Sequence, residues 1–63
     1  MKHRGRIFKI GNSRTYAFVR DDDGSTAYIS ARHVWNLEVG DVIEYDTEAA
    51  EKGPRVTALR VLA

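Results

Sequence analysis

Two short segments of alternating residues, joined by an acidic turn, constrain the fold of this chain more than any other feature. Residues 14–20 (RTYAFVR) and 25–30 (STAYIS) flank a turn at residues 21–24 (DDDG). In both segments, small or β-branched residues alternate with aromatic or hydroxyl-bearing ones. A period of two is typical of a β-strand whose two faces have different surroundings. The sequence therefore predicts two neighbouring strands, joined by a turn whose final glycine accepts a positive φ.

If these two strands pair, their aromatic side chains stand together on one face of the sheet. The rings are Tyr16, Phe18 and Tyr28, and Arg14 and Arg20 flank them. Rings that stack on bases, with cations that hold phosphates beside them, are typical of proteins that bind single-stranded nucleic acid. The alternative is that the rings form the core, where the tyrosine hydroxyls need partners and a small barrel has little room. We favour an exposed aromatic platform.

The chain is short and has no cysteine. Its 63 residues are enough for one domain, over residues 1–63, that no disulfide stabilises. The 43% hydrophobic and 30% charged residues are typical of a globular protein rather than a disordered one. No apolar run approaches membrane-spanning length, and the first residues lack the apolar core of a signal peptide. We expect a monomeric, cytoplasmic protein with no membrane partner.

Charge is segregated along the chain, although the net charge is only +1. Residues 1–20 carry six bases and no acid, residues 21–51 carry nine acids and one base, and residues 52–63 carry three bases. If the two ends adjoin in the fold, one side of the protein is basic and the other acidic. A basic side would steer the protein toward a polyanion. The alternative is that the charges only keep a small domain soluble.

The chain predicts five short strands separated by tight turns, at residues 5–10, 15–20, 26–31, 42–47 and 55–62. We expect one short helical turn within residues 31–37, between the third and fourth strands, with Val34 and Leu37 facing the core. A sheet this small exposes unpaired edges unless it closes on itself. The pattern therefore predicts an all-β fold, a five-stranded antiparallel OB-fold barrel, with an SH3-like barrel as the alternative.

The first predicted strand, residues 5–10 (GRIFKI), does not alternate cleanly. Strict alternation puts Ile7 and Lys9 on one face and Phe8 and Ile10 on the other. A β-bulge in this strand would bring both Ile7 and Ile10 to the core. Alternation also separates Phe8 from Lys9, so on this pattern the two side chains do not share a surface.

Four groups of residues, read in order, resemble the motifs of a known family. Residues 14–19 (RTYAFV) are similar to the first ribonucleoprotein motif, KGFGFI, of the cold-shock domain family, and residues 27–30 (AYIS) lie where its second motif, VFVH, stands. Residues 37–40 (LEVG) and 52–54 (KGP) match the family's L-x-x-G and KGP. In order and in spacing, the chain resembles this family over nearly its whole length.

The resemblance implies an OB-type barrel that binds single-stranded RNA or DNA. We expect weak sequence selectivity, because every base has a π face on which to stack. The resemblance implies stacking positions for Tyr16, Phe18 and Tyr28, and contacts of Arg14 and Lys52 with the nucleic-acid backbone. It also implies RNA-chaperone activity, in which RNA is held single-stranded without ATP, or a cold-shock-type effect on transcription or translation.

The predicted aromatic face has fewer rings than the motifs of the family provide. Lys9 stands where the family has a stacking tryptophan, and Ser30 replaces the histidine of the second motif. Trp35 lies in a shortened loop, where it either covers the end of the barrel or stacks on a base. With fewer rings and more positive charge, we expect modest, salt-sensitive binding. The candidate nucleic-acid-binding residues are Phe8, Lys9, Arg14, Tyr16, Phe18, Arg20, Tyr28, Ser30, Trp35 and Lys52.

The sequence gives little support for a metal site or a catalytic site. His3 and His33 have no metal-ligand spacing, and residues 21–23 lack the alternating ligands and the distal glutamate of a calcium loop. No pairing of nucleophile and base is recognisable. We therefore expect no enzyme activity, no metal and no cofactor. Two alternatives stay open: a protein-interaction module that uses the rings and the acidic residues 38–51, and a barrel that binds structured RNA mainly by charge.

Overall fold

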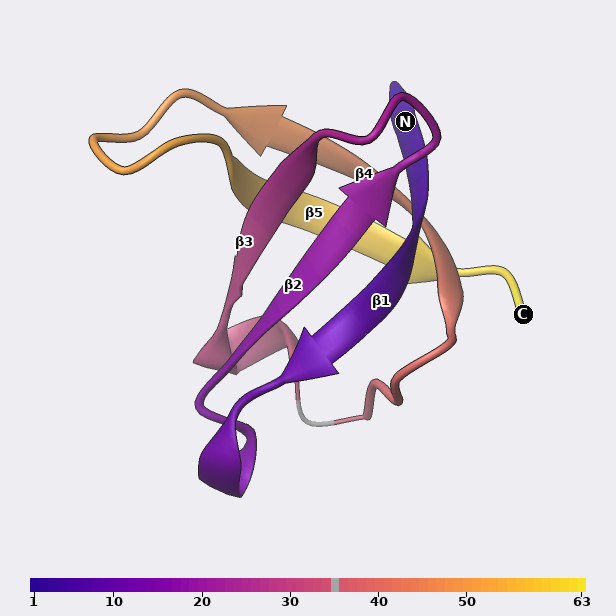
Figure 1. Cartoon of the computed structure of the whole chain (residues 1–63), viewed down its shortest axis with the longest axis vertical. Helices are drawn as coiled ribbons and strands as arrows, with labels where there is room; N and C mark the ends of the chain where they lie inside the picture. The colour runs from indigo at the N-terminus through magenta and orange to yellow at the C-terminus, as the bar shows by residue number, and fades with distance from the viewer. Residues whose placement is uncertain (35) are drawn as a thin grey trace.

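Residues 1–34 and 36–63, which the computed structural model describes, form five strands that close into a barrel (Figure 1). Hydrogen-bonded neighbours follow the order β1-β2-β3-β5-β4, and β1 also pairs with β4, so the ring is closed. The all-β, OB-type barrel that the sequence predicts is therefore confirmed. The strands are β1 (His3–Ile10), β2 (Tyr16–Asp21), β3 (Thr26–Ser30), β4 (Val42–Glu48) and β5 (Arg55–Val61).

Within this described part of the chain, the helical segments are two 3₁₀ turns, η1 (Asn12–Arg14) and η2 (Ala31–His33). In the described residues, no helix reaches the length and hydropathy of a membrane span. η2 lies between β3 and β4, where the sequence predicts a helical turn. Val34 and Leu37, which follow it, are 0% exposed and cover the core as expected.

The turn η1 moves the start of the second strand one residue later than the sequence predicts. Ser13 and Arg14 have φ of 59° and 55°, in the left-handed region that extended strands do not use. β2 therefore begins at Tyr16, and Arg14 stands in the turn before it. The predicted start of this strand, at residue 15, was one residue too early.

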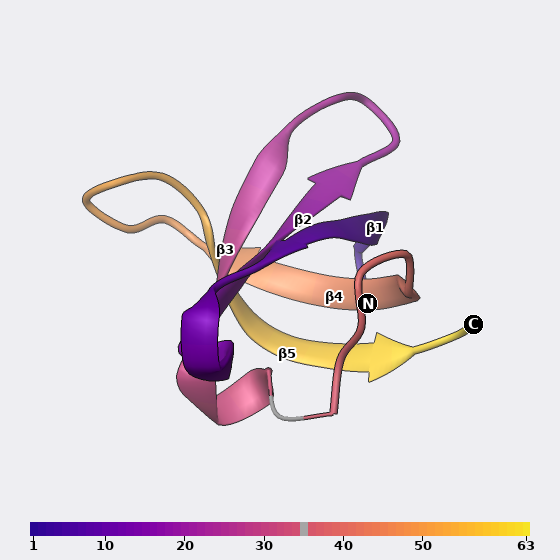
Figure 2. The same ribbon diagram turned by 60° about the horizontal axis from the view of Figure 1, so that its bottom comes forward.

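One of the strand pairings differs in direction from the others. β1–β2, β2–β3, β1–β4 and β4–β5 are antiparallel, whereas β3 and β5 run parallel. Tyr28 pairs in register with Arg55, and its backbone N–H donates to the carbonyl of Pro54 at 3.1 Å. This contact holds the loop between β4 and β5 next to β3, and Figure 2 shows that loop projecting away from the barrel.

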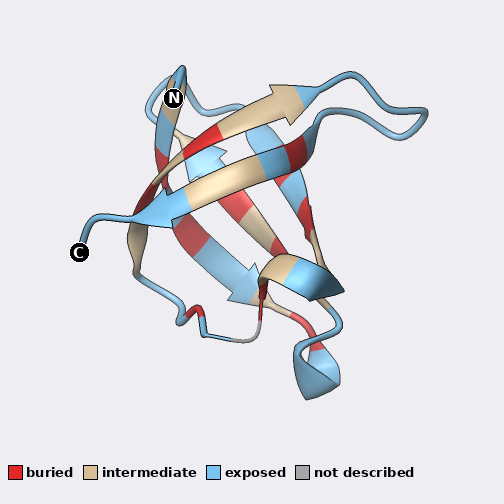
Figure 3. Cartoon of the chain, turned by 180° about the vertical axis from the view of Figure 1, so that it is seen from behind, coloured by how far each residue is buried: buried red, intermediate tan, exposed pale blue. Residues whose placement is uncertain are grey.

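The core follows the alternation read from the sequence. In most of β1, β2, β3 and β4, buried positions alternate with exposed or half-buried ones, as Figure 3 shows. Ala17 and Val19 of β2 face the same interior as Ile43 and Tyr45 of β4, all at most 2% exposed. Ile10 and Leu59 pack against this core from partly buried positions. The buried hydrophobic side chains are Ile7, Ala17, Val19, Ala27, Ile29, Val34, Leu37, Ile43, Tyr45 and Val56.

A β-bulge interrupts β1. Ile7 pairs with Val19, but the next pair is Lys9 with Phe18, so one residue of β1 has no partner of its own in β2. Ile7 is consequently buried, and Ile10 also packs against the core, as the predicted bulge requires. The extra residue is Phe8. Because it shifts the alternation by one, Phe8 and Lys9 both face outward, and the expectation that they lie on opposite faces was wrong.

Candidate nucleic-acid interface

A row of aromatic rings crosses the outer face of β1, β2 and β3. Phe18 stands in its centre, with ring centroids 6.3 Å from Phe8, 5.8 Å from Tyr16 and 5.8 Å from Tyr28. The register explains the row, because Phe18 pairs with Tyr28 across β2 and β3, and the bulge turns Phe8 toward it from β1. The structure thus brings together rings that are 20 residues apart in the sequence, between Phe8 and Tyr28.

The rings lie on the surface, as the alternation predicts, but they are not coplanar. Phe8 and Tyr28 are each 38% exposed, and Tyr16 and Phe18 are half-buried. Phe18 meets Tyr16 at 74° and Tyr28 at 68°, so these rings touch edge to face. The result is a stepped apolar surface rather than a flat one, and each step exposes part of a ring face.

Gly11 sets the position of Tyr16. A Cβ atom at Gly11 would lie 2.1 Å from the Tyr16 ring, so only glycine lets the ring lie down against the backbone. The Gly11 N–H also donates to the Tyr16 carbonyl at 2.8 Å. A contact between a glycine and a ring five residues later has no periodic signal, so the sequence does not reveal this role of Gly11.

Two cations rest on rings at the edges of the row. The guanidinium carbon of Arg20 lies 4.3 Å from the centroid of Phe8, and Nζ of Lys9 lies 5.9 Å from that of Tyr16. Both contacts are within the range of cation–π attraction. In the described residues, no carboxylate pairs with Lys9, Arg20 or Lys52. Their charges therefore stay available to an anionic partner.

Arg14 is differently engaged. Its guanidinium donates to the backbone carbonyl of Leu37 and forms an ion pair with Glu38. These contacts tie η1 to the loop that follows η2. The sequence predicts that Arg14 flanks the rings as a free cation, but in the structure its charge is balanced by Glu38.

The remaining candidate residues occupy the margins of the row. Lys52 lies in the β4–β5 loop and lines, with Phe18 and Tyr28, an open groove of about 540 Å³. Ser30, at the end of β3, pairs in register with Tyr16 and borders a smaller hollow of about 150 Å³. Trp35 lies outside the described residues.

The predicted division into a basic and an acidic side is not realised around β4. This strand lies between β1 and β5, so its acids stand between their bases. Glu44 pairs with Arg60 of β5 and is in register with Arg4 of β1. Glu48 pairs with Arg55. The charge blocks of the sequence are thus interleaved by strand order.

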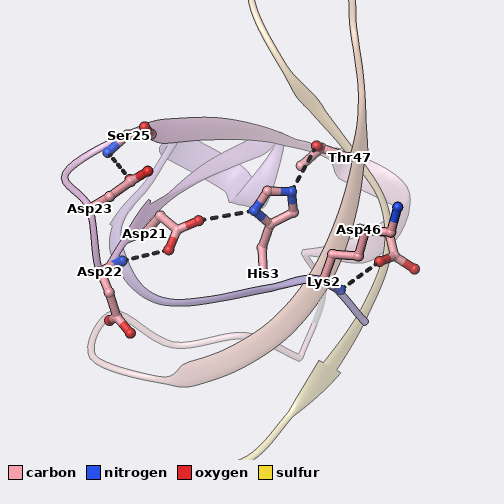
Figure 4. A network of polar contacts seen from close by, with 8 residues as sticks. All are labelled: Lys2, His3, Asp21, Asp22, Asp23, Ser25, Asp46 and Thr47. Carbon is pink, nitrogen blue, oxygen red and sulfur yellow. Dashed lines mark hydrogen bonds and ion pairs between the residues drawn. The ribbon is translucent and has the colours of Figure 1, made fainter.

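Carboxylates of the acidic turn, residues 21–24, form hydrogen bonds within the fold (Figure 4). Asp21 lies 3.0 Å from Nδ1 of His3, and Nε2 of His3 lies 3.4 Å from the Thr47 hydroxyl. The imidazole stacks on Tyr45, 5.3 Å between centroids. Burial, followed by the charge of Asp21, raises the pKa of Tyr45 to about 12. This network joins the start of β1 to the end of β2 and to the second half of β4.

Two carboxylates of this turn also accept hydrogen bonds from the backbone of the turn itself. Asp21 accepts the N–H of Asp22 at 2.6 Å, and Asp23 accepts the N–H of Ser25 at 2.8 Å. The hydrogen bonds from Ser25 hold the pKa of Asp23 below its ordinary value. In the part of the chain that the structure describes, no cluster of histidine and carboxylate side chains could hold a metal ion.

No protein-family model matches the chain, and no curated protein matches it either.

Proposed function

We propose that this protein binds single-stranded RNA or DNA on the outer face of β1, β2 and β3. The observation that carries the proposal is the row of surface rings, Phe8, Tyr16, Phe18 and Tyr28, on the face of an OB-type barrel. Such rings suit single strands because every base has a π face on which to stack. The resemblance of the sequence motifs to those of the cold-shock domain family supports the same function.

Phe18 and Tyr28 are the rings best placed to receive bases. In the described residues no cation rests on either, whereas Arg20 covers Phe8 and Lys9 approaches Tyr16. As a strand binds, the two cations move from the rings to the phosphates, and the bases take their places. Each stacked base contributes about 1–3 kcal/mol. Binding starts at the uncovered centre and extends toward the covered edges.

The proposal is of a binding protein rather than an enzyme. Stacking and phosphate contacts hold a strand without reading base edges, so most of the site is weakly selective. Holding RNA single-stranded without ATP is the work of an RNA chaperone, with effects on transcription or translation. We place the protein in the cytoplasm as a monomer, in keeping with the expectations from its sequence.

Titration of labelled oligonucleotides tests the proposal. Single-stranded RNA and DNA should bind, and the logarithm of the association constant should fall with the logarithm of salt concentration, with a slope of roughly −0.7 for each phosphate neutralised. Duplexes of the same sequence should bind more weakly. Absence of binding to either single strand at low salt would refute the proposal, and stronger binding of duplex RNA would favour a charge-driven binder of structured RNA.

Replacement of the central ring gives the sharpest test of the site. Phe18→Ala should weaken single-strand binding by roughly 5- to 140-fold, because it removes one stacking surface worth about 1–3 kcal/mol. The control is Val39→Ala, which trims a side chain that is 62% exposed and lies in the loop between η2 and β4. Thermal unfolding checks that Phe18→Ala remains folded, and Phe18→Leu keeps apolar volume if it does not. Unchanged affinity in a folded Phe18 variant contradicts the assignment.

A further inference from the structure

The open groove beside the aromatic row differs from the row because one of its walls carries charged residues. One wall consists of Phe18 and Tyr28, and the other is formed by the β4–β5 loop, including Ala50, Glu51 and Lys52. The volume of about 540 Å³ lies within the range of small-molecule sites, roughly 300–1,000 Å³. It is large enough for one nucleoside, and it adjoins the rings on which neighbouring bases would stack.

The loop that forms the second wall is held in place. Tyr28 donates its backbone N–H to Pro54, and the N–H of Gly53 donates to the carbonyl of Ala50 at 3.0 Å. Gly53 has φ of 120°, which allows this turn. Arg55, which also lines the groove, is paired with Glu48. The groove therefore keeps its shape without a ligand.

Two consecutive residues of opposite charge, Glu51 and Lys52, line this wall. In the described residues, Glu51 and Lys52 take part in no ion pair. A surface that only held phosphates would gain nothing from Glu51, since a carboxylate repels them. A carboxylate accepts hydrogen bonds and an ammonium group donates them. Together they suit a ligand edge that carries both hydrogen-bond donors and an acceptor. Base edges are of this kind.

We propose that this groove is a guanine-selective subsite, in which Glu51 reads the base edge. The proposal rests on the proposed single-strand binding. The Watson–Crick edge of guanine carries two adjacent donors, N1–H and the N2 amino group, and one acceptor, O6. The donors match the two oxygens of Glu51, and O6 matches the ammonium of Lys52, while Tyr28 stacks on the ring.

The other bases fit this pair less well. Uracil and thymine have a single N–H between two carbonyl oxygens, so a carboxylate that accepts it also faces an oxygen. Adenine and cytosine offer an amino group next to a ring nitrogen acceptor, which leaves one oxygen of Glu51 without a donor. A bidentate contact with a base edge discriminates by about 1–3 kcal/mol, which corresponds to a preference of roughly 5- to 140-fold.

The experiment compares four RNA oligonucleotides that are uridine tracts differing only in one central base. A single guanine per strand avoids guanine-rich structures. We expect the guanine strand to bind the full chain at least fivefold more tightly than the uridine strand, at the lower end of that range because the groove is open. Glu51→Gln should abolish the preference while binding itself persists.

Asp22→Asn is the matched control. It removes the same charge from an exposed residue in the turn between β2 and β3, so it should raise all four affinities alike and keep the guanine preference. Equal affinities for all four strands, or a guanine preference that survives Glu51→Gln, would overturn the subsite and leave single-strand binding intact. Absence of binding to every strand would overturn the proposed function as well.

Discussion

Single residues decide the shape of the aromatic surface. Phe18 contacts three other rings, so its position is over-determined by its neighbours. Gly11 matters because it has no side chain: a Cβ atom at this position would collide with Tyr16. The surface is therefore built from residues of two kinds: rings that can touch bases, and a small residue that lets one of those rings lie flat.

A substitution at Gly11 tests this dependence. Gly11→Ala puts a methyl group where the Tyr16 ring now lies, at 2.1 Å, so the ring must move. We expect weaker single-strand binding and a lower free energy of unfolding, by about 1–3 kcal/mol as for other overpacking changes. Urea unfolding and oligonucleotide titration measure the two effects.

The Tyr16→Ala background provides the control for Gly11→Ala. With the ring removed, the methyl group has space, so the same change should cost much less in stability and in binding. If Gly11→Ala costs as much in that background as in the natural sequence, the glycine is required for the backbone of the turn and not for the ring.

At the scale of elements, the bulge in β1 determines what the first strand contributes. It lets Ile7 and Ile10 both reach the core, and it places Phe8 and Lys9 together on the outside. A regular strand of the same length could bury only one of the two isoleucines. The bulge thus adds a ring to the aromatic row without removing apolar surface from the core.

Two single-residue deletions distinguish the roles of the bulge. Removal of either Phe8 or Lys9 leaves one outward residue between Ile7 and Ile10, so both deletions restore regular alternation and both proteins should fold. Without Phe8 the strand presents lysine, and single-strand binding should weaken by about 1–3 kcal/mol for the lost stack. Without Lys9 it presents phenylalanine, and binding should weaken less or improve.

Circular dichroism and oligonucleotide titration compare the two deletions directly, and each serves as the control for the other. Equal binding by both folded variants would show that Phe8 adds nothing to the interface. Loss of folding in both would mean that the barrel needs the bulge for its curvature rather than for its surface.

For the whole molecule, closure at one end depends on the network around His3. Asp21, Thr47 and Tyr45 surround the imidazole, and they come from β2 and β4. Ion pairs on the surface, such as Glu44 with Arg60, join β4 to β5. Surface pairs of this kind contribute little individually, so the packed core and the buried tyrosine carry more of the closure.

Alkaline pH should open this end of the barrel. Burial raises the pKa of Tyr45 from 10.0 to about 12, so folding favours its neutral form. The associated stability is fully present below pH 10 and is lost as the pH rises through about 12. Urea unfolding across this window measures the loss. The Tyr45→Phe variant has no titrating hydroxyl, so it should lose less stability across this pH range. Identical pH profiles of the two proteins would show that Tyr45 does not cause the loss.

Much of the fold could be predicted from the sequence because its determinants are local. The period of two along residues 16–20 and 26–30 depends only on strand geometry, so Ala17, Val19 and the rings were assigned to the correct faces. The bulge was predictable from two isoleucines at an odd spacing. Its consequence for Phe8 and Lys9 was missed because the position of the extra residue depends on the register with β2.

What only the tertiary structure decided is which segments become neighbours. Strand order sets the acids of β4 between the bases of β1 and β5, and Arg14 finds Glu38 across 24 residues. The groove exists because the parallel contact of β3 with β5 holds residues 50–53 beside Tyr28. The sequence by itself determined the strands, their faces and the presence of a surface of rings, since side-chain alternation is a local property. The partners of each charge and the walls of the groove depend on closure of the barrel, which joins residues far apart in the chain.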